Sequence, residues 1–255
     1  LWSDCAGLSA EMCSAHQLEA KLEQLLGVRV EFILYAGCDP NRTSKKFCMN
    51  NHDPKHWADD VSERKWDTGE YKDVMPCEAI VALMPREGMD LYIAGWPCTP
   101  FSKRGAQLRG EDPVAQLIWD VLNSISFMKP AFFCFENVTN VEDENDEFWL
   151  KIKCRIQEKL QDYHLSQITG STPIAVGYPA ARSRFKLLGG WGDVCSAETI
   201  PQMLGLLTAA PMQLVHNWLT FLGLEEGPCW ERMGSVASTE DIAHLGGCKC
   251  GLDPY

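Results

Sequence analysis

Asp90-Leu-Tyr-Ile-Ala-Gly95 is a short apolar run, and Ala131-Phe-Phe-Cys-Phe135 repeats this composition further along the chain. Runs of this length, rich in aliphatic and aromatic residues, are typical of strands buried on both faces. Residues 114–128 lie between them and have the pattern of a helix that ends before Lys129-Pro130. A strand, a helix and a second strand in this order predict a right-handed βαβ unit in a parallel sheet.

The same alternation extends in both directions from this unit. Apolar residues at helical spacing are followed by Gly27, where a helix C-terminus favours glycine. We expect helices over residues 9–26, 146–161 and 200–222, and strands over residues 28–36, 163–169 and 184–189. The predicted fold class is α/β, a doubly wound and mostly parallel sheet with a helical C-terminal extension. The predicted domains are residues 1–192 for the sheet domain and 193–255 for the extension.

Composition sets limits on the class of protein. The chain has 255 residues, 12 cysteines without a repeating spacing, and a net charge of -12. A run of about 20 apolar residues, as a membrane span needs, is absent from the sequence, and so is a basic leader. We expect free thiols and an intracellular location, nuclear if the source is eukaryotic and otherwise cytoplasmic, with no membrane partner. The acidity argues against nucleic-acid binding by this chain alone, although residues 193–255 hold much of it.

A cysteine flanked by prolines follows the first of the two quoted strands, in Gly95-Trp-Pro-Cys98-Thr-Pro-Phe-Ser102. Loops at the carboxyl ends of parallel strands carry the ligand sites of such sheets. A thiol placed there is reactive if nearby positive charge, such as Lys103 or Arg104, stabilises the thiolate. The alternative for Cys98 is a buried structural thiol.

Two further polar groups are expected at the same edge of the sheet. Phe135-Glu-Asn-Val138 places the carboxyl group of Glu136 at the end of the second strand, where a partly desolvated carboxyl can act as an acid. Arg182 and Arg184 alternate in sequence and share one face if extended. The alternative for the two arginines is pairing with surface acids.

A nucleotide site is indicated by the first loop of the chain. Small residues in Ser3-Asp-Cys-Ala-Gly7 lead directly into a helix, so a ligand can approach the backbone at the helix N-terminus. Asp39 follows one helix and one strand later, where α/β nucleotide sites place an acid for ribose hydroxyls. The alternative for Asp39 is a solvated turn residue before Pro40.

Taken in order, these segments resemble the cytosine-C5 methyltransferase family across about residues 1–190. The most specific element is PCTPFS at 97–102, where the family has Pro-Cys-Gln-Pro-Phe-Ser. The Glu-Asn-Val and Arg-x-Arg boxes have the family's order. Leu117-Ile-Trp-Asp-Val121, Lys129-Pro130 and Ala58-Asp-Asp-Val61 also match family segments.

The resemblance implies a Rossmann-like fold and methyl transfer from S-adenosylmethionine to C5 of a cytosine flipped out of duplex DNA. It implies that Cys98 attacks C6, Glu136 contacts N3 and the exocyclic amine, Arg184 holds the O2 edge, and Arg182 supports the loop. For the cofactor it places Trp2 on the adenine, Ala6 and Gly7 at the methionine end, Asp39 on the ribose, and Asp60 on the adenine amine. The full cofactor set implied is Trp2, Ser3, Cys5, Ala6, Gly7, Leu8, Asp39, Pro40, Asp60, Val61, Pro97 and Leu117.

The chain departs from the family pattern at several points. Asp4 and Ala6 stand where the family has glycines, Ala180 replaces a glutamine, and Pro40 replaces a larger side chain. Met233-Gly-Ser resembles the late cofactor motif but leaves only about 50 residues after the arginine box. A target-recognition domain does not fit there. We therefore expect a catalytic fragment of a longer protein with further domains.

Three alternatives to DNA methylation stay open. The first is the same chemistry on transfer RNA, although the Cys-Phe-Thr tripeptide typical of that branch is absent from the sequence. The second is a non-catalytic regulatory module, and the third is a methyltransferase of small molecules. No metal is expected, because Cys248-Lys-Cys250 lacks the second cysteine pair of a zinc site.

Overall fold

The computed structural model describes residues 1–27, 29–61, 64–65, 70–71, 88–171 and 183–202. The chain divides into two contact units, of which the first comprises Leu1–Gly170 and Arg184–Leu204. The second, Ser171–Ser183 with Gly205–Tyr255, lies almost wholly outside the described residues. The predicted helix over 200–222 therefore falls outside them except at its start. The proposed boundary at residue 192 stays a prediction.

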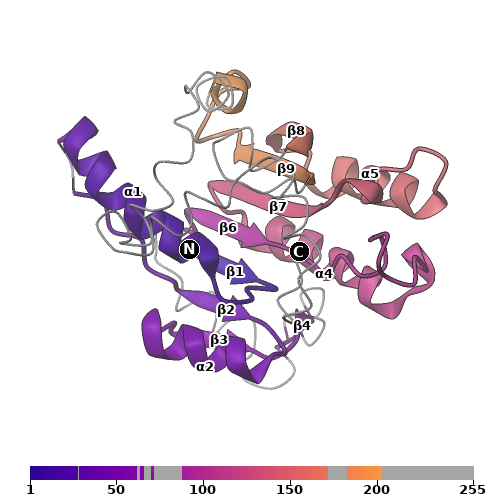
Figure 1. Ribbon diagram of the computed structural model, residues 1–255. Helices are drawn as coiled ribbons and strands as arrows, with labels where there is room; N and C mark the ends of the chain where they lie inside the picture. Colours follow the sequence, from indigo (N-terminus) through magenta and orange to yellow (C-terminus); the bar gives the residue numbers. More distant parts are fainter. Residues whose placement is uncertain (28, 62–63, 66–69, 72–87, 172–182, 203–255) are drawn as a thin grey trace, which may run out of the picture. The chain divides into compact units, whose positions relative to one another are not determined.

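The first unit is built on a seven-stranded sheet in the order β3-β2-β1-β6-β7-β9-β8 (Figure 1). Its strands are β1 (Trp2–Asp4), β2 (Ala36–Cys38), β3 (His56–Ala58), β6 (Leu91–Ala94), β7 (Phe132–Val138), β8 (Tyr163–Ser171) and β9 (Arg184–Trp191). Neighbours from β3 through β7 pair in parallel, and β9 pairs antiparallel with β7. The predicted mostly parallel, doubly wound sheet is confirmed. A separate two-stranded ladder joins β4 (Arg64–Lys65) and β5 (Glu70–Tyr71).

The helices are α1 (Ala10–Leu26), α2 (Arg42–Asn51), α4 (Leu117–Met128) and α5 (Glu147–Lys159) within the described ranges. Short 3-10 turns are η2 (Arg109–Glu111), η3 (Pro113–Gln116) and η4 (Thr139–Val141). Local sequence explains their ends. Gly27 adopts a left-handed φ of 66° at the end of α1, and the Asp146 side chain accepts from the Phe148 N–H at the start of α5.

One core lies between the sheet and the helices α4 and α5. Buried Tyr92 and Phe135 of the strands join Leu122 of α4 and Ile152 of α5 in a single cluster. On alternate positions of β6, Leu91 and Ile93 pack instead in the cluster that contains Met12 of α1. The period of two along the strand thus sends side chains to both faces, as a doubly wound sheet requires.

The predicted strand over residues 28–36 is largely wrong. β2 is confined to Ala36–Cys38 because its register partners are the three residues of β1. The preceding segment runs beside Leu1, which donates to the Ile33 carbonyl at 2.8 Å and accepts from the Tyr35 N–H at 2.8 Å. Among the described residues of the apolar run only Leu34, Tyr35 and Ala36 are buried, whereas Ile33 is 56% exposed, and burial alone does not supply a ladder partner.

The direction of the chain sets where a ligand can bind. From β1 the chain builds outward to β2 and β3, and it then returns to add β6 and β7 on the other side of β1. The carboxyl ends of β1 and β6 therefore flank the point where the strand order reverses. Ligands of open α/β sheets bind in the crevice at such a point. Among the described residues, no helix is both long and apolar enough to cross a membrane.

Candidate active site

The loop after β6 presents Cys98 at this edge of the sheet. The Cys98 carbonyl accepts from the Phe101 N–H at 3.0 Å and from the Ser102 N–H at 2.9 Å, so the backbone turns tightly at the cysteine. Phe101 is 1% exposed and anchors the loop in the core. Cys98 itself is a free, half-buried thiol. These features are those of a stiffly held cysteine at a ligand-binding edge.

Glu136 and Arg184 form an ion pair on neighbouring strands. The Arg184 Nε lies 2.5 Å from the Glu136 Oε1, with the two side chains 12% and 39% exposed respectively. The antiparallel register brings them together, because Val138 of β7 pairs with Arg184 of β9 and Glu136 is two residues along the same face. The sequence named both residues but did not predict this contact.

The Glu136 segment is fixed against the cysteine loop. The buried Asn137 donates its side-chain N–H to the Trp96 carbonyl at 3.1 Å. A Cβ built on Gly95 would lie 3.6 Å from the Glu136 Oε2, so the carboxylate faces the backbone just ahead of Cys98. Arg184, Glu136 and the cysteine loop thus share one corner of the sheet. Arg182 lies outside the described residues.

A second cysteine near this corner is chemically different. Cys134 lies on β7, two residues before Glu136. Burial raises the pKa of the Cys134 thiol to about 11, with opposing effects from Lys186 and Glu136. Although part of the residue is accessible, its sulfur is desolvated, and the thiol stays protonated at neutral pH. Cys134 is therefore a structural thiol.

The predicted cofactor residues of the first three strands lie together. The Gly7 N–H donates to the Asp39 Oδ2 at 2.9 Å, and the Ala6 N–H donates to the Cys38 carbonyl at 2.9 Å. The Asp39 N–H in turn bonds the Ala58 carbonyl at 3.2 Å, which connects the end of β3. The structure thus brings the first loop, Asp39 and the segment before Asp60 to one edge of the sheet.

The apolar part of the predicted cofactor set also forms a cluster. Val61 is 2% exposed and packs with Cys38 and Ala58, and Leu117 at the start of α4 packs against them. The predicted residues that face solvent are Leu8, which is 53% exposed, and Pro40. Ser3 is buried and donates to the Glu11 carboxylate. Pro97, next to Cys98, is half-buried.

In the first loop, Asp4 places a buried carboxylate where the family has a glycine. Asp4 has no exposed surface, and it accepts from the Trp2 indole at 3.0 Å and from the Tyr92 hydroxyl at 2.6 Å. Trp2, predicted to lie on the adenine, is itself 1% exposed. Left-handed φ values fall at Cys5 (54°) and Gly7 (52°), whereas Asp4 and Ala6, which replace the family's glycines, are not among the positive-φ residues. The cost of those substitutions is therefore bulk rather than backbone strain.

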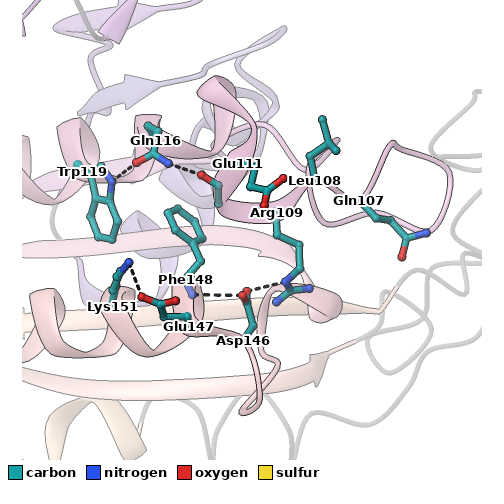
Figure 2. A pocket seen from close by; sticks show the side chains of 11 residues that line it. Gln107, Leu108, Arg109, Glu111, Gln116, Trp119, Asp146, Glu147, Phe148 and Lys151 are labelled. Atoms are coloured by element: carbon teal, nitrogen blue, oxygen red, sulfur yellow. Dashed lines mark hydrogen bonds and ion pairs between the residues drawn. The ribbon is translucent and has the colours of Figure 1, made fainter.

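Sequence reasoning missed two features next to the site. The helix α2 begins directly after Asp39-Pro40, and its signal was Asn41, whose side chain accepts from the Thr43 and Ser44 N–H groups. The second is a half-open pocket of about 600 Å³, formed by η2 and the residues just before it, the start of α4 and the start of α5. Figure 2 shows Arg109 and Trp119 among its lining side chains. None of the predicted site residues lines it.

The mostly parallel sheet thus carries a polar ligand-type corner at β1–β3, and a cysteine, a carboxylate and an arginine beyond β6, as α/β proteins that bind ligands at strand ends do. Residues 31–194 match the family model described as C-5 cytosine-specific DNA methylase. The chain belongs to this family. The matched range includes Asp39, Cys98, Glu136 and Arg184 but not the first loop around Gly7.

Individual relatives agree with this assignment. The chain is 31% identical over 101 residues to the type II methyltransferase M.PspPI of Psychrobacter sp., which covers 40% of this chain and 24% of the relative. It is 31% identical over 96 residues to the type II methyltransferase M.AluI of Cellulosimicrobium cellulans, covering 36% and 18% respectively. The matched segment therefore spans about a quarter or less of these curated relatives.

A solved structure shares the fold. The methyltransferase EhMeth of Entamoeba histolytica superimposes with a TM-score of 0.51 at 15% identity, covering 74% of this chain and 52% of that protein. At this identity the likeness concerns the fold alone. It agrees with the mostly parallel seven-stranded sheet described above.

Proposed function

We propose that the protein to which this chain belongs transfers a methyl group from S-adenosylmethionine to C5 of cytosine in DNA. The observation that carries the proposal is the corner of Cys98, Glu136 and Arg184. The Arg184–Glu136 ion pair and the Asn137–Trp96 hydrogen bond hold the carboxylate beside the cysteine loop. Membership of the family supports this reaction, and with it we propose an intracellular setting, in which thiols stay reduced.

In the proposed reaction the Cys98 sulfur forms a bond to C6 of the base, and the electrons of the C5–C6 double bond move to C5. Carbon C5 then takes the methyl group, which S-adenosylmethionine supplies when bound. A base removes the proton from C5, the double bond re-forms, and the C6–S bond breaks to release the thiolate. The target base leaves the stack, since its ring atoms are not reachable inside a duplex.

Glu136 and Arg184 have complementary tasks in this proposal. Glu136 accepts a hydrogen bond from the exocyclic amine of cytosine and, in its protonated form, donates its proton toward N3, where negative charge develops as C6 is attacked. Arg184 orients the Glu136 carboxylate through its Nε and presents its remaining donors to O2 of the base. A planar guanidinium suits this double role because its donors point in fixed directions.

The residues at the ends of β1–β3 fit S-adenosylmethionine at its ribose and adenine end. Asp39 offers a carboxylate at the turn, and Val61 with Leu117 forms an apolar wall. At the methionine end Asp4 adds bulk, but both its oxygens accept hydrogen bonds inside the protein, from Trp2 and Tyr92. Its carboxylate is therefore satisfied internally rather than directed at solvent.

The test is covalent trapping with a duplex that contains 5-fluorocytosine, because fluorine at C5 cannot leave as the proton does. The protein is incubated with this duplex and S-adenosylmethionine and then denatured. We expect an adduct with the wild type and none with Cys98→Ala. Cys154→Ala is the matched control, because Cys154 is an exposed free thiol on α5.

An adduct that needs both Cys98 and the cofactor supports the proposal. An adduct with 5-fluorocytosine RNA but not with DNA would assign the reaction to RNA. If S-adenosylmethionine binds and no adduct forms with either nucleic acid, the protein is a non-catalytic member of the family. Trapping by Cys98→Ala would contradict the assigned nucleophile.

A further inference from the structure

Arg109, in the short turn η2, makes three hydrogen bonds with one guanidinium. Its Nε donates to the Asp146 Oδ2 at 2.5 Å, its Nη1 to the Asn140 carbonyl at 2.9 Å, and its Nη2 to the Val141 carbonyl at 3.2 Å. Figure 2 shows the Arg109 side chain directed at Asp146. The two side chains are 23% and 16% exposed, so water screens the pair only partly.

The same residue is joined to the cysteine loop. The Arg109 N–H donates to the Pro100 carbonyl at 3.1 Å, two residues after Cys98. Its guanidinium lies 5.7 Å from the centre of the Phe101 ring, and Phe101 stacks on Phe148 of α5 with ring centres 6.1 Å apart. Arg109 therefore contacts the cysteine loop through both its backbone and its side chain.

The carbonyl groups that accept from Arg109 lie close in sequence to Glu136. Asn140 and Val141 belong to η4, which directly follows β7 and the Glu136-Asn-Val138 box. On the other side, Asn137 is bonded to Trp96, two residues before Cys98. The segment from Trp96 to Arg109, which contains Cys98, is therefore joined to the segment from Glu136 to Val141 at both of its ends. Asn137 bonds Trp96 at one end, and Arg109 bonds η4 at the other. A closed path of this kind restrains the distance between the cysteine and the carboxylate.

The backbone at Arg109 indicates that its position is imposed by this packing. Arg109 has a φ of 50°, in the left-handed region that residues with a side chain rarely adopt. The next residue, Gly110, lies so close to Phe148 that a Cβ would come within 2.5 Å of the ring. The close packing of Gly110 holds the turn, and the turn aims the guanidinium at its three acceptors.

We propose that Arg109 is a positioning residue, which holds the Cys98 loop at a fixed distance from Glu136 through Asp146 and η4. This inference rests on the proposed function for its effect on catalysis. Its loss lowers the rate of methyl transfer while cofactor binding is retained, because the residues at the ends of β1–β3 do not contact Arg109 in the bonds described. A misplacement of about 1 Å between reacting groups costs on the order of 10²-fold in rate.

The test compares Arg109→Met with Arg155→Met, a control on α5 that removes an exposed arginine paired only with Glu158 in the contacts described. Single-turnover methylation is measured at saturating DNA and S-adenosylmethionine, beside the dissociation constant of the cofactor. We expect Arg109→Met to methylate about 10- to 100-fold more slowly than the wild type, with an unchanged dissociation constant for the cofactor. In Arg155→Met both quantities should equal those of the wild type. Equal losses of rate and cofactor binding, or no loss of rate, overturn the proposal.

Asp146→Asn separates positioning from folding. Asparagine keeps the oxygen that caps α5 at the Phe148 N–H, and it replaces the Oδ2 that receives the Arg109 Nε. We expect an intact helix by circular dichroism together with a smaller loss of rate than in Arg109→Met. A wild-type rate in this variant contradicts the role assigned to the Arg109–Asp146 pair.

Hydrogen exchange tests the restraint without any turnover, so it also applies if the wild-type protein proves inactive. The amides of Phe101 and Ser102 bond the Cys98 carbonyl and report on the loop. In Arg109→Met they should exchange faster than in the wild type, whereas the amides of α4 should not change. Unchanged exchange of the two loop amides refutes the positioning role, whatever the outcome of the activity assay.

Discussion

Gly105→Ala is expected to displace the loop that carries Cys98. The Gly105 N–H donates to the Ser102 carbonyl and to the Ser102 hydroxyl, both at 3.0 Å, so the backbone folds back toward the cysteine. A Cβ on Gly105 would lie 1.9 Å from the Thr99 carbonyl oxygen and 3.1 Å from the Ser102 Oγ. The main obstacle is thus backbone, directly adjacent to Cys98.

The magnitude follows from that distance. Cβ atoms are essentially never found closer than 3.0 Å to such a neighbour, so the contact at 1.9 Å must open by about 1.1 Å. If most of this movement is passed on to the adjacent Cys98, the sulfur is displaced by about 1 Å from the position assigned to it in the proposed reaction. A misplacement near 1 Å corresponds to a loss on the order of 10²-fold in rate. Overpacking of this kind also costs about 1–3 kcal/mol of stability.

The assay is single-turnover methyl transfer with saturating DNA and S-adenosylmethionine, beside a denaturant titration of the free energy of unfolding. Gly192→Ala is the matched control, because its Cβ would meet the Asp162 carbonyl oxygen at 3.1 Å and needs a shift of only tenths of an ångström. We expect about 100-fold slower transfer in Gly105→Ala and little change in the control. Transfer within about threefold of the wild type would refute the reasoning, because the loop would then absorb the clash without moving Cys98.

Three other predictions concern polar side chains near the site and the first helix. Tyr92→Phe removes a donor from the fully buried Asp4 and should lower the free energy of unfolding by about 1–3 kcal/mol in a denaturant titration; an unchanged value would show that the bond contributes nothing. Burial raises the pKa of Glu11 above 4.5, against the opposing hydrogen bond from Ser3, so its ionisation destabilises the fold. The stability of the wild type relative to Glu11→Gln should therefore fall as the pH rises from 4.5 toward the folded-state pKa of Glu11. At pH 7 Glu11→Gln should be the more stable of the two, and thermal melts at several pH values can check both expectations. Arg184→Lys loses the Nε that bonds Glu136, and transfer should slow by about 10- to 100-fold at an unchanged cofactor affinity, measured by titration.

Several elements were predictable because their cause is local. The helix over 9–26 ends at Gly27 as expected, and the strand at Asp90–Gly95 appears as β6, Leu91–Ala94. The helix expected over 114–128 is α4, Leu117–Met128, preceded by the 3-10 turn Pro113–Gln116. Apolar spacing and capping residues act within a few residues of themselves. The expected strand over 28–36 failed for the opposite reason, since a ladder depends on a partner elsewhere in the chain.

In the candidate site, too, some features could be predicted from the sequence and others depend on distant segments of the chain. Cys98, Glu136 and Asp39 are identifiable from sequence, because each lies in a motif directly after a predicted strand, and parallel strands bring such ends to one edge. Arg184 is identifiable from the Arg-x-Arg box, and it reaches the same edge as the first residue of an antiparallel strand. The convergence of Gly7 with Asp39, at 2.9 Å, agrees with that expectation. By contrast, Asp4 appeared in the sequence only as added bulk, and its bonds to Trp2 and Tyr92 came from the fold.

By itself, the sequence determined the βαβ unit of β6, α4 and β7, the helix that ends before Gly27, the motifs at the strand ends, and the family. Only the tertiary structure decided that β9 runs antiparallel to β7, which places Arg184 against Glu136, and that Arg109 reaches Asp146 and the turn after β7. The physical reason is that motifs and periodicity are encoded in neighbouring residues, whereas the Arg184–Glu136 ion pair and the Arg109 hydrogen bonds depend on how segments distant in sequence are aligned. A one-residue slip of β9 would leave every motif intact and turn the Arg184 side chain to the opposite face, away from Glu136.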